Sequence, residues 1–356
     1  MRYKSDWEQA EKRHAAFWHG ELLDRCCVSI RSGDDQLNPL LDRFWQRNNR
    51  DVTLVRTHPE LLIEQNRIIM EHTHYGGDAF PLASVDLGAS GHAGFFKGAQ
   101  YQIENTVWFS PTLEDPDNLE FDENSYLYQQ TLETVRAFVQ DSQGDYFVSM
   151  PDSSGNADAL AHLMGPEELL VSMLEDPEAI KEALSKIQLS YRNIMQRVYD
   201  MVHGVNRGGS CIGWLNTWAP GFHAQMQCDL SVMISNPMFK EFIMPELQAQ
   251  CGLLDYPLYH FDGIEQLRHL DDLLSLPNLK TIQWTQVVGQ SPCTDFIPQL
   301  QKIQAAGKNL HISVSPHQIR PLMENLSSRG LYLLTWADSK DEADANEKDV
   351  TRWTHD

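Results

Sequence analysis

Two spacings of apolar residues alternate along most of this chain, and the alternation predicts the fold. Apolar residues at every third or fourth position are typical of amphipathic helices, whereas short apolar runs bounded by Gly, Pro, Asn or Asp are typical of buried strands. Beyond the first third of the chain, the predicted helices cover residues 125–143, 157–164, 166–174, 177–202, 237–254, 264–274, 295–306, 318–328 and a segment after 339. The predicted strands cover 145–150, 209–215, a short piece ending near 229, 257–261, 279–284, 309–314 and 331–336.

This order of elements favours a parallel sheet covered by helices, because successive parallel strands need a long crossover between them. Seven or eight strands within about 250 residues fit a closed (β/α)8 TIM barrel, and an open doubly wound sheet is the alternative. The sequence contains no GxGxxG or GxxxxGK[ST] loop for a nucleotide phosphate. We therefore expect residues 1–356 to form a single α/β domain, a (β/α)8 barrel.

The first 125 residues are expected to add N-terminal helices and an irregular, lid-like insertion to this barrel. Apolar residues at helical spacing predict a helix over 7–20 and a longer one over 59–74, with a short apolar run at 26–30 between them. Residues 76–109 are rich in Gly and aromatic residues and show no clean period. That segment is expected to be irregular, as an inserted hairpin or a lid.

The charge balance limits the partners. The chain has 28 basic and 50 acidic residues, a net charge of −22, and no basic stripe offsets it, so nucleic acids and polyanionic substrates are disfavoured. No apolar run approaches the roughly 18 residues that cross a bilayer, and we expect a cytoplasmic protein without a membrane partner. The six cysteines lack metal-site or disulfide-framework spacing, which predicts reduced thiols.

The sharpest candidate for chemistry is the sequence Tyr-His-Phe-Asp-Gly at 259–263. In a parallel barrel the active site forms at the carboxyl ends of the strands. On an extended segment His260 and Asp262 project to the same side, and Gly263 lets the chain turn away after them. An imidazole and a carboxylate that converge there could form an acid/base pair or supply two metal ligands. The structural alternative is that His260 bonds a neighbouring carbonyl and Asp262 caps the next helix.

Further polar residues are predicted at other strand ends. Asp229 closes the short extended piece, and Gln227 should lie on the same side of it. Asp152 follows the strand at 145–150 and could point into the same mouth. Both carboxylates also suit purely structural roles, Asp229 as a helix cap and Asp152 in a turn.

Aromatic residues could line a pocket for a planar or methylated ligand, although large aromatics also fill the top layer of a barrel. The candidates are Trp214, Trp218, Trp284 and Trp336, which lie at or just beyond strand ends. His311 alternates with Ser313 on one strand and could reach the mouth. If His260 and Asp262 bind a metal such as zinc, a third ligand must come from elsewhere, with Asp229, His311 and Cys293 as alternatives.

Four stretches of the chain resemble the uroporphyrinogen decarboxylase superfamily, which includes methylcobamide:coenzyme M methyltransferases. They are 11–13 (EKR) with 18–25 (WHGELLDR); 155–160 (GNADAL) with 165–170 (GPEELL) and 176–178 (DPE); 229–231 (DLS) with 239–245 (FKEFIMP); and 260–263 (HFDG). Together they span nearly the whole chain. The resemblance implies a (β/α)8 barrel independently of the alternation described above.

Two departures from the family pattern bear on function. In the family that the chain resembles, the true decarboxylase carries an arginine-rich segment after its first strand. The corresponding residues of this chain, 28–35 (VSIRSGDD), hold a single arginine, Arg31, and two acids. This argues against a porphyrinogen substrate. The methyltransferase branch carries a zinc-binding His-x-Cys where this chain has His260-Phe261-Asp262, and no cysteine follows Cys293. His260 matches the retained ligand, whereas a zinc thiolate site is in doubt.

Three functions remain open from the sequence. The first is a barrel enzyme resembling the corrinoid-linked methyltransferases, which moves a methyl group between a small substrate and a cobamide, free or on a partner corrinoid protein, or another acceptor. The second is a lyase or decarboxylase on a small organic acid, with His260 and Asp262 as acid and base and Arg31 holding a carboxylate. The third is a barrel that binds a small ligand or a corrinoid protein without chemistry. By analogy, a homodimer is also expected.

Overall fold

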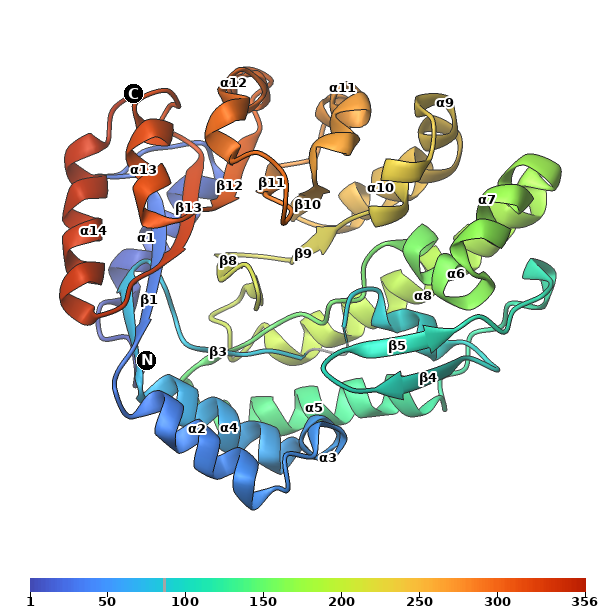
Figure 1. Cartoon of the computed structure of the whole chain (residues 1–356), viewed down its shortest axis with the longest axis horizontal. Helices are drawn as coiled ribbons and strands as arrows, with labels where there is room; N and C mark the ends of the chain where they lie inside the picture. The colour runs from blue at the N-terminus through green and yellow to red at the C-terminus, as the bar shows by residue number, and fades with distance from the viewer. Residues whose placement is uncertain (86–87) are drawn as a thin grey trace.

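A seven-stranded sheet forms the centre of the molecule (Figure 1). In the computed structural model, which describes residues 1–85 and 88–356, the strand order is β2-β1-β13-β12-β11-β10-β9. Every neighbouring pair is parallel except β2 with β1. The strands are β1 (Cys27–Gly33), β2 (Thr73–Gly77), β9 (His223–Met226), β10 (Tyr256–Asp262), β11 (Thr281–Thr285), β12 (Asn309–Ser313) and β13 (Leu331–Trp336). The α/β class and the parallel sheet are therefore confirmed.

The other strands are short and pair only with each other. β3 (Leu82–Ala83) is parallel to β6 (Phe147–Val148), and β7 (Ser210–Ile212) is antiparallel to β8 (Thr217–Ala219). One bridge between Met150 and Ile212 joins the β6 segment to β7. Among the described residues the hydrogen-bonded sheet does not close, so the predicted closed barrel is not established. Pro81 and Pro151 flank β3 and the β6 segment, and a proline supplies no N–H to a ladder.

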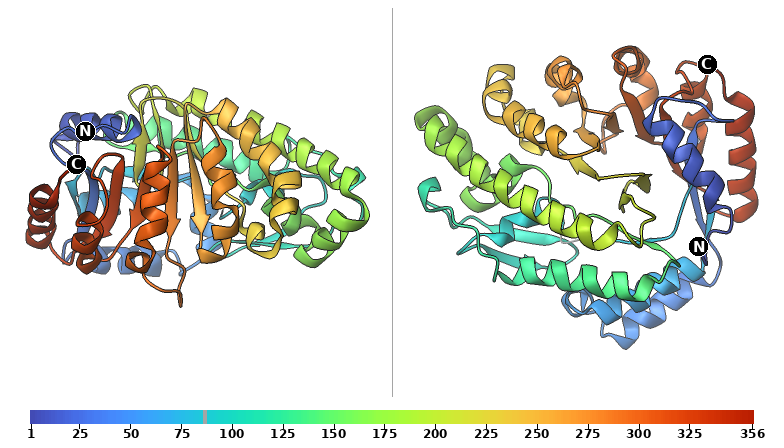
Figure 2. Two further views of the ribbon diagram at one scale, coloured as in Figure 1. Left: turned by 90° about the horizontal axis from the view of Figure 1, so that it is seen from above. Right: turned by 180° about the vertical axis from the view of Figure 1, so that it is seen from behind.

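Helices cover the outer side of the curved main sheet (Figure 2). The N-terminal helices are α1 (Trp7–Trp18), α2 (Leu37–Arg47), α3 (Val52–Thr57) and α4 (Pro59–Glu71). The middle helices are α5 (Tyr126–Ser142), α6 (Asn156–Met164), α7 (Pro166–Glu175), α8 (Pro177–Val202), α9 (Asn236–Met238) and α10 (Met244–Leu253). The last are α11 (Leu270–Ser275), α12 (Ile297–Ala305), α13 (Pro316–Met323) and α14 (Lys340–Trp353). No described helix is both long enough and apolar enough to traverse a bilayer.

Local sequence signals explain why some of these helices end where predicted. Helix α8 matches the predicted 177–202 because Pro177 occupies its first turn and the Asp176 carboxylate accepts a hydrogen bond from the N–H of Ala179. The predicted helix over 237–254 is instead interrupted by a π-helical turn, Phe239–Ile243, before α10. Pro245 lies just after that turn, and its missing N–H accounts for the interruption.

The N-terminal third departs most from expectation. The predicted helix over 59–74 stops at Glu71, and residues 73–77 form β2. Helices α2 and α3 were not predicted. The segment 76–109, expected to be irregular with a hairpin or lid, does contain an antiparallel hairpin of β4 (Gln100–Ile103) and β5 (Val107–Ser110); its residues 86–87 lie outside the described part.

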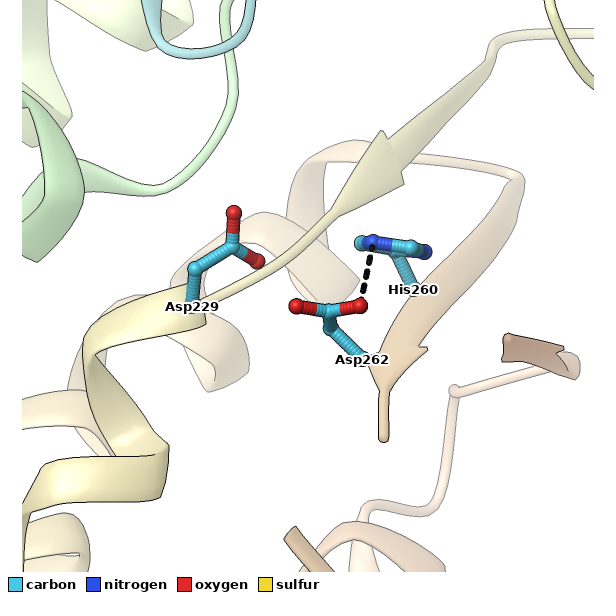
Figure 3. Close-up of side chains that lie close together, drawn as sticks. All are labelled: Asp229, His260 and Asp262. Carbon is cyan, nitrogen blue, oxygen red and sulfur yellow. Dashed lines mark ion pairs between the residues drawn. The ribbon is translucent and has the colours of Figure 1, made fainter. Parts of the chain in front are cut away.

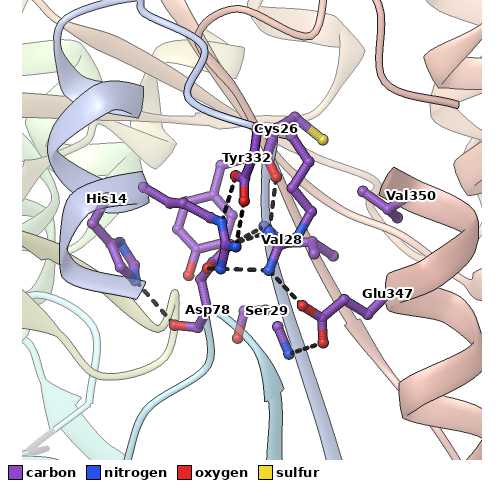
Figure 4. Close-up of polar contacts among 12 residues, drawn as sticks. His14, Cys26, Val28, Ser29, Asp78, Tyr332, Glu347 and Val350 are labelled. Carbon is purple, nitrogen blue, oxygen red and sulfur yellow. Dashed lines mark hydrogen bonds and ion pairs between the residues drawn. The ribbon is translucent and has the colours of Figure 1, made fainter. Parts of the chain in front are cut away.

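The most deeply buried ion cluster ties the two ends of the chain together (Figure 4). The Asp78 carboxylate, which follows β2 and is fully buried, accepts hydrogen bonds from Arg25 Nη1 at 2.5 Å and from the N–H of Val28 at 2.9 Å. Arg25 also donates to Glu347 of α14 at 2.8 Å. The two arginines that contact it, Arg13 and Arg25, hold the pKa of Asp78 below its usual value although burial opposes this.

Replacement of Asp78 by Asn should destabilise the fold severely. The change leaves the buried Arg25 guanidinium short of a counter-charge, a defect that typically costs about 3–5 kcal/mol. The free energy of unfolding, measured by urea denaturation, should fall by this amount. Asp24→Asn is the matched control, because Asp24 pairs with Arg13 with its side chain 49% exposed, and it should cost less than about 1 kcal/mol. Equal effects of the two substitutions would contradict the assigned role of Asp78.

Buried neutral histidines should make the fold sensitive to mild acid. Burial lowers the pKa of His14 and of His311 to about 4. Because an unfolded histidine titrates near 6.5, the unfolded state binds more protons than the folded state between about pH 6.5 and 4, so each residue lowers the stability as the pH falls through this window.

His311→Gln tests this linkage, since glutamine can still donate to the carbonyl of Leu215 as His311 Nε2 does. The dependence of unfolding free energy on pH between 6.5 and 4.5 should become less steep by up to about 1.4 kcal/mol per pH unit. The measurement is a series of urea denaturation curves across that range. An unchanged slope would show that His311 binds protons equally in the folded and the unfolded state.

Candidate functional site

Three side chains with metal-binding atoms converge at the carboxyl end of the main sheet. Asp229, His260 and Asp262 each offer one ligand atom, and these atoms lie within 4.8 Å of one another. His260 Nε2 is 3.9 Å from Asp262 Oδ1. Figure 3 shows Asp229 reaching in from the chain after β9 while the other two project from β10.

The register of two strands explains the convergence. His260 and Asp262 are two residues apart on β10 and therefore share a face, as predicted from the sequence. β9 pairs with β10 so that Met226 lies opposite Tyr259. Asp229 is three residues beyond Met226, and Asp262 is three beyond Tyr259, so the two carboxylates come level at the sheet edge. Gly263 then turns the chain away with φ +87°, a conformation that favours glycine.

Side chains on β11 fix the orientation of the imidazole. His260 Nδ1 donates to Gln283 Oε1, and Thr285 Oγ1 lies 3.2 Å from the same nitrogen. The Gln283 amide is itself held by its Nε2, which donates to Thr285 Oγ1 at 2.9 Å. With the proton on Nδ1, the lone pair of Nε2 faces the carboxylates. This is the arrangement in which an outer hydrogen bond prepares a histidine to bind a metal ion.

A buried carboxylate on α6 holds Asp229 in place. Asp158 accepts hydrogen bonds from the N–H of Asp229 at 2.9 Å and from the N–H of Leu230 at 2.8 Å. Gly155 permits this approach, because a Cβ at that position would lie 2.2 Å from Asp158 Oδ2. The predicted structural alternative, in which Asp229 itself serves only as a cap, is not what the geometry shows: Asp158 receives the backbone N–H groups, and Asp229 is left facing His260.

The site concentrates negative charge in a poorly solvated place. Burial, together with the nearby carboxylates of Asp262 and Asp152, raises the pKa of Asp229 to about 7. Burial, followed by the charge of Asp229, likewise raises the pKa of Asp158 to about 7. Burial lowers the pKa of His260, which favours its neutral, ligand-competent form.

The donor set fits a divalent metal ion. Within the described residues Asp229 Oδ1 is buried without a hydrogen-bond partner, and such an atom normally has a partner or an ion. One imidazole nitrogen and two carboxylate oxygens suit zinc or another first-row divalent ion. All six cysteines are free and buried, and none belongs to the cluster found among the described side chains, so the site is not of the thiolate type. Neither His311 nor Cys293, the other predicted third ligands, belongs to the cluster found among the described side chains.

A polar wall separates this cluster from the neighbouring cavities. Trp214 meets the His260 ring edge-on, with 5.1 Å between ring centroids, and donates through Nε1 to Gln225 Oε1 at 2.6 Å. Gln225 Nε2 donates to Asp152 Oδ1 at 2.6 Å and to Gln227 Oε1 at 3.0 Å. Asp152, Trp214 and Gln225 line a cavity of about 110 Å³, whose lining does not include the three clustered residues themselves.

Arg31 lies in a larger cavity on the other side of Trp214. This cavity of about 410 Å³ is lined by Arg31, Tyr75, Ser84 and Trp214 among others. Arg31 forms no ion pair with any residue that the structure describes. Trp336 is level with Arg31 on the adjacent strand and is 55% exposed, but it does not line this cavity.

Three residues predicted to face the mouth are buried in the interior instead. His311 lies two strands away from His260, packs against the Tyr332 ring and bonds the carbonyl of Leu215. Trp284 is stacked on Phe261, on the opposite face of β11 from Gln283. Trp218 is packed with Trp7 of α1. None of the three lines the cavities beside the site, and their ligand-binding role has no geometric support.

Four residues that the sequence did not single out build the surroundings of the site. They are Asp158, Gln225, Gln283 and Thr285. The alternation of polar Gln283 and Thr285 on a predicted strand, which repeats the pattern of His260 and Asp262, was a usable signal. Gln225 lies two residues before the predicted Gln227 and carries the same signal, whereas Asp158 gave none, because its contacts cross between distant elements.

The comparisons with known proteins identify the fold but no family. No protein-family model matches the sequence, and no curated protein matches it. Among solved structures, the chain is similar to a methyltransferase from Methanosarcina mazei, with a TM-score of 0.62 and 12% identity over 96% of this chain and 98% of that one. The chain thus shares its fold with a methyltransferase, and the resemblance to the uroporphyrinogen decarboxylase superfamily is not established at the level of family.

Gln283→Leu should weaken metal binding. Without its Oε1 acceptor the imidazole of His260 loses the partner that holds its proton on Nδ1, and such outer-shell changes typically reduce affinity about 10–100-fold. The dissociation constant for Zn²⁺ should be measured by competition with a chromophoric chelator. Gln286→Leu, an exposed position on the same side of the molecule, should leave it unchanged, and equal constants for wild type and Gln283→Leu would disprove the role of Gln283.

Proposed function

We propose that this protein is a (β/α)8 barrel-type methyltransferase that moves a methyl group between a small substrate and a corrinoid carrier or another acceptor. The observation that carries the proposal is the convergence of Asp229, His260 and Asp262 at the carboxyl end of parallel strands, in a fold shared with a methyltransferase. This edge is where α/β folds place their chemistry. The fold alone does not imply the activity, so the site supplies the argument.

A divalent ion held by these three residues would act as a Lewis acid toward the atom that carries or receives the methyl group. His260 contributes the Nε2 lone pair, and the two aspartates neutralise the charge of the ion. Trp214 covers the imidazole and limits the access of water, while Arg31 supplies a positive end for a substrate carboxylate. A separate corrinoid protein would be the natural bearer of a cobamide carrier.

One observation favours a lyase or decarboxylase as the second candidate. With its pKa raised to about 7, Asp229 retains a proton near neutral pH beside a neutral imidazole. A protonated carboxylic acid and an unprotonated base are the partners that acid/base chemistry on a small organic acid requires. In this reading Arg31 binds the substrate carboxylate.

Metal content and methyl exchange test the leading proposal together. The purified protein should hold about one equivalent of a divalent ion by elemental analysis, and it should demethylate methylcobalamin in the presence of suitable acceptors. His260→Ala and Asp262→Asn should each lower both metal content and rate about tenfold or more. His317→Ala and Asp338→Asn, exposed residues after β12 and β13, are matched controls that should change neither.

The same variants separate the two candidates. A protein that binds no metal and exchanges no methyl group over a broad acceptor panel would not be a metal-dependent methyltransferase. If it then releases CO2 from small organic acids, with a loss of about 10²-fold or more in His260→Ala while folding stays intact, the acid/base function is supported instead.

A further inference from the structure

Trp214 forms the boundary between the two cavities beside the site. The larger cavity of about 410 Å³ and the smaller one of about 110 Å³ share Ser84, Gly213 and Trp214 in their walls. Ser84 and Gly213 are small, so the indole of Trp214 is the large group that separates the two cavities. The larger cavity has the size of a small-molecule site, whereas the smaller has room for only a few water molecules.

The backbone under Trp214 is held in place on both sides. A Cβ at Gly213 would lie 2.1 Å from Ser84 Oγ, so only glycine allows the chain to approach there. The carbonyl of Leu215 accepts from His311 Nε2 at 3.0 Å, and Asn216 Oδ1 accepts from Ser29 Oγ at 2.6 Å. The turn is therefore fixed, and the 42% exposed side chain of Trp214 is the part that can change position.

A chain of three polar groups sets the position of that side chain. The Nε2 group of Gln225 donates to Asp152 Oδ1 at 2.6 Å and to Gln227 Oε1 at 3.0 Å. The Oε1 atom of the same amide must then face the other way, where it accepts from Trp214 Nε1 at 2.6 Å. Because Nε1 is the only donor of an indole, this bond fixes the ring. Gln225 is 3% exposed, so its amide is held within the protein.

We propose that Gln225 is a positioning residue that locks Trp214 as the wall of the substrate chamber lined by Arg31, and that Trp214 thereby determines the size of the ligand that this chamber admits. In the locked position the indole confines a ligand to the Arg31 side and stands edge-on to the imidazole at 5.1 Å. Release of the indole joins the two cavities and admits a longer ligand. The inference deepens the proposed function and rests on it only for the identity of the substrate.

The position of Trp214 can be observed directly. In protein labelled with 5-fluorotryptophan, the ¹⁹F resonance of Trp214 is assigned among the nine tryptophans by its loss in Trp214→Phe. Gln225→Leu should shift this resonance toward the solvent-exposed position or split it, while Gln286→Leu should leave it in place. An unchanged resonance in Gln225→Leu would overturn the role of Gln225.

The size of the chamber is tested with two carboxylate probes, chosen because Arg31 lines the larger cavity. Wild type should bind benzoate more tightly than 2-naphthoate. In both Gln225→Leu and Trp214→Phe the dissociation constant for benzoate, divided by that for 2-naphthoate, should rise about tenfold. Trp336→Phe is the matched control, since that exposed tryptophan borders neither cavity.

Each outcome bears on one proposal. A ratio that stays the same in Trp214→Phe, or a wild type that binds neither carboxylate, would overturn the assignment of Trp214 as the chamber wall. A wild type that shows the expected probe binding and ¹⁹F behaviour but transfers no methyl group would count against the proposed function and leave the assignment intact.

Discussion

One buried carboxylate, Asp78, joins the parts of the chain that begin and end the main sheet (Figure 4). Through Arg25 it connects the start of β1 to Glu347 on the C-terminal helix α14, and through the N–H of Val28 it ties itself to β1 directly. These contacts keep β1 beside β13, the pairing that links the first strand to the last five of the chain, β9 to β13. The common edge at which the candidate site forms depends on that order, because Arg31 on β1 and His260 on β10 belong to one sheet only while it holds.

The same type of side chain behaves in opposite ways at the two ends of the sheet. Asp78 is fully buried, yet two arginines keep its pKa low, so its charge is compensated and its role is structural. Asp158 and Asp229 are also poorly solvated, but their largest charged neighbours are other carboxylates, and their pKa values rise to about 7. Among the described residues, the fold provides arginines for Asp78 but no cation for Asp158 and Asp229, which lie beside His260 and are therefore functional candidates.

The sequence predicted the elements of the site better than their surroundings. The two-residue spacing of His260 and Asp262 fixed their common face, and the short piece ending at Asp229 was expected at the same edge. The depth of a residue in the sheet was harder to predict. His311 is level with His260 in the strand register, but two strands along the sheet it is sealed by a long-range contact with the carbonyl of Leu215. Trp284 follows an inward-facing glutamine and must therefore point outward, a consequence of strand alternation that becomes visible only once the inward residue is known.

The charge of the site argues for a bound cation over an isolated acid/base pair. Asp262 and Asp152 lie close enough to Asp229 to add to the rise that burial causes in its pKa, and burial lowers the pKa of His260, the one basic group in the cluster, which favours its neutral form. Either protons or a metal ion must neutralise these carboxylates. Protons would neutralise the carboxylates. They would not explain why Gln283 turns the Nε2 lone pair of His260 toward those carboxylates. A divalent ion uses that lone pair and both nearby aspartates at once, so it accounts for the orientation of the imidazole as well as for the accumulation of negative charge.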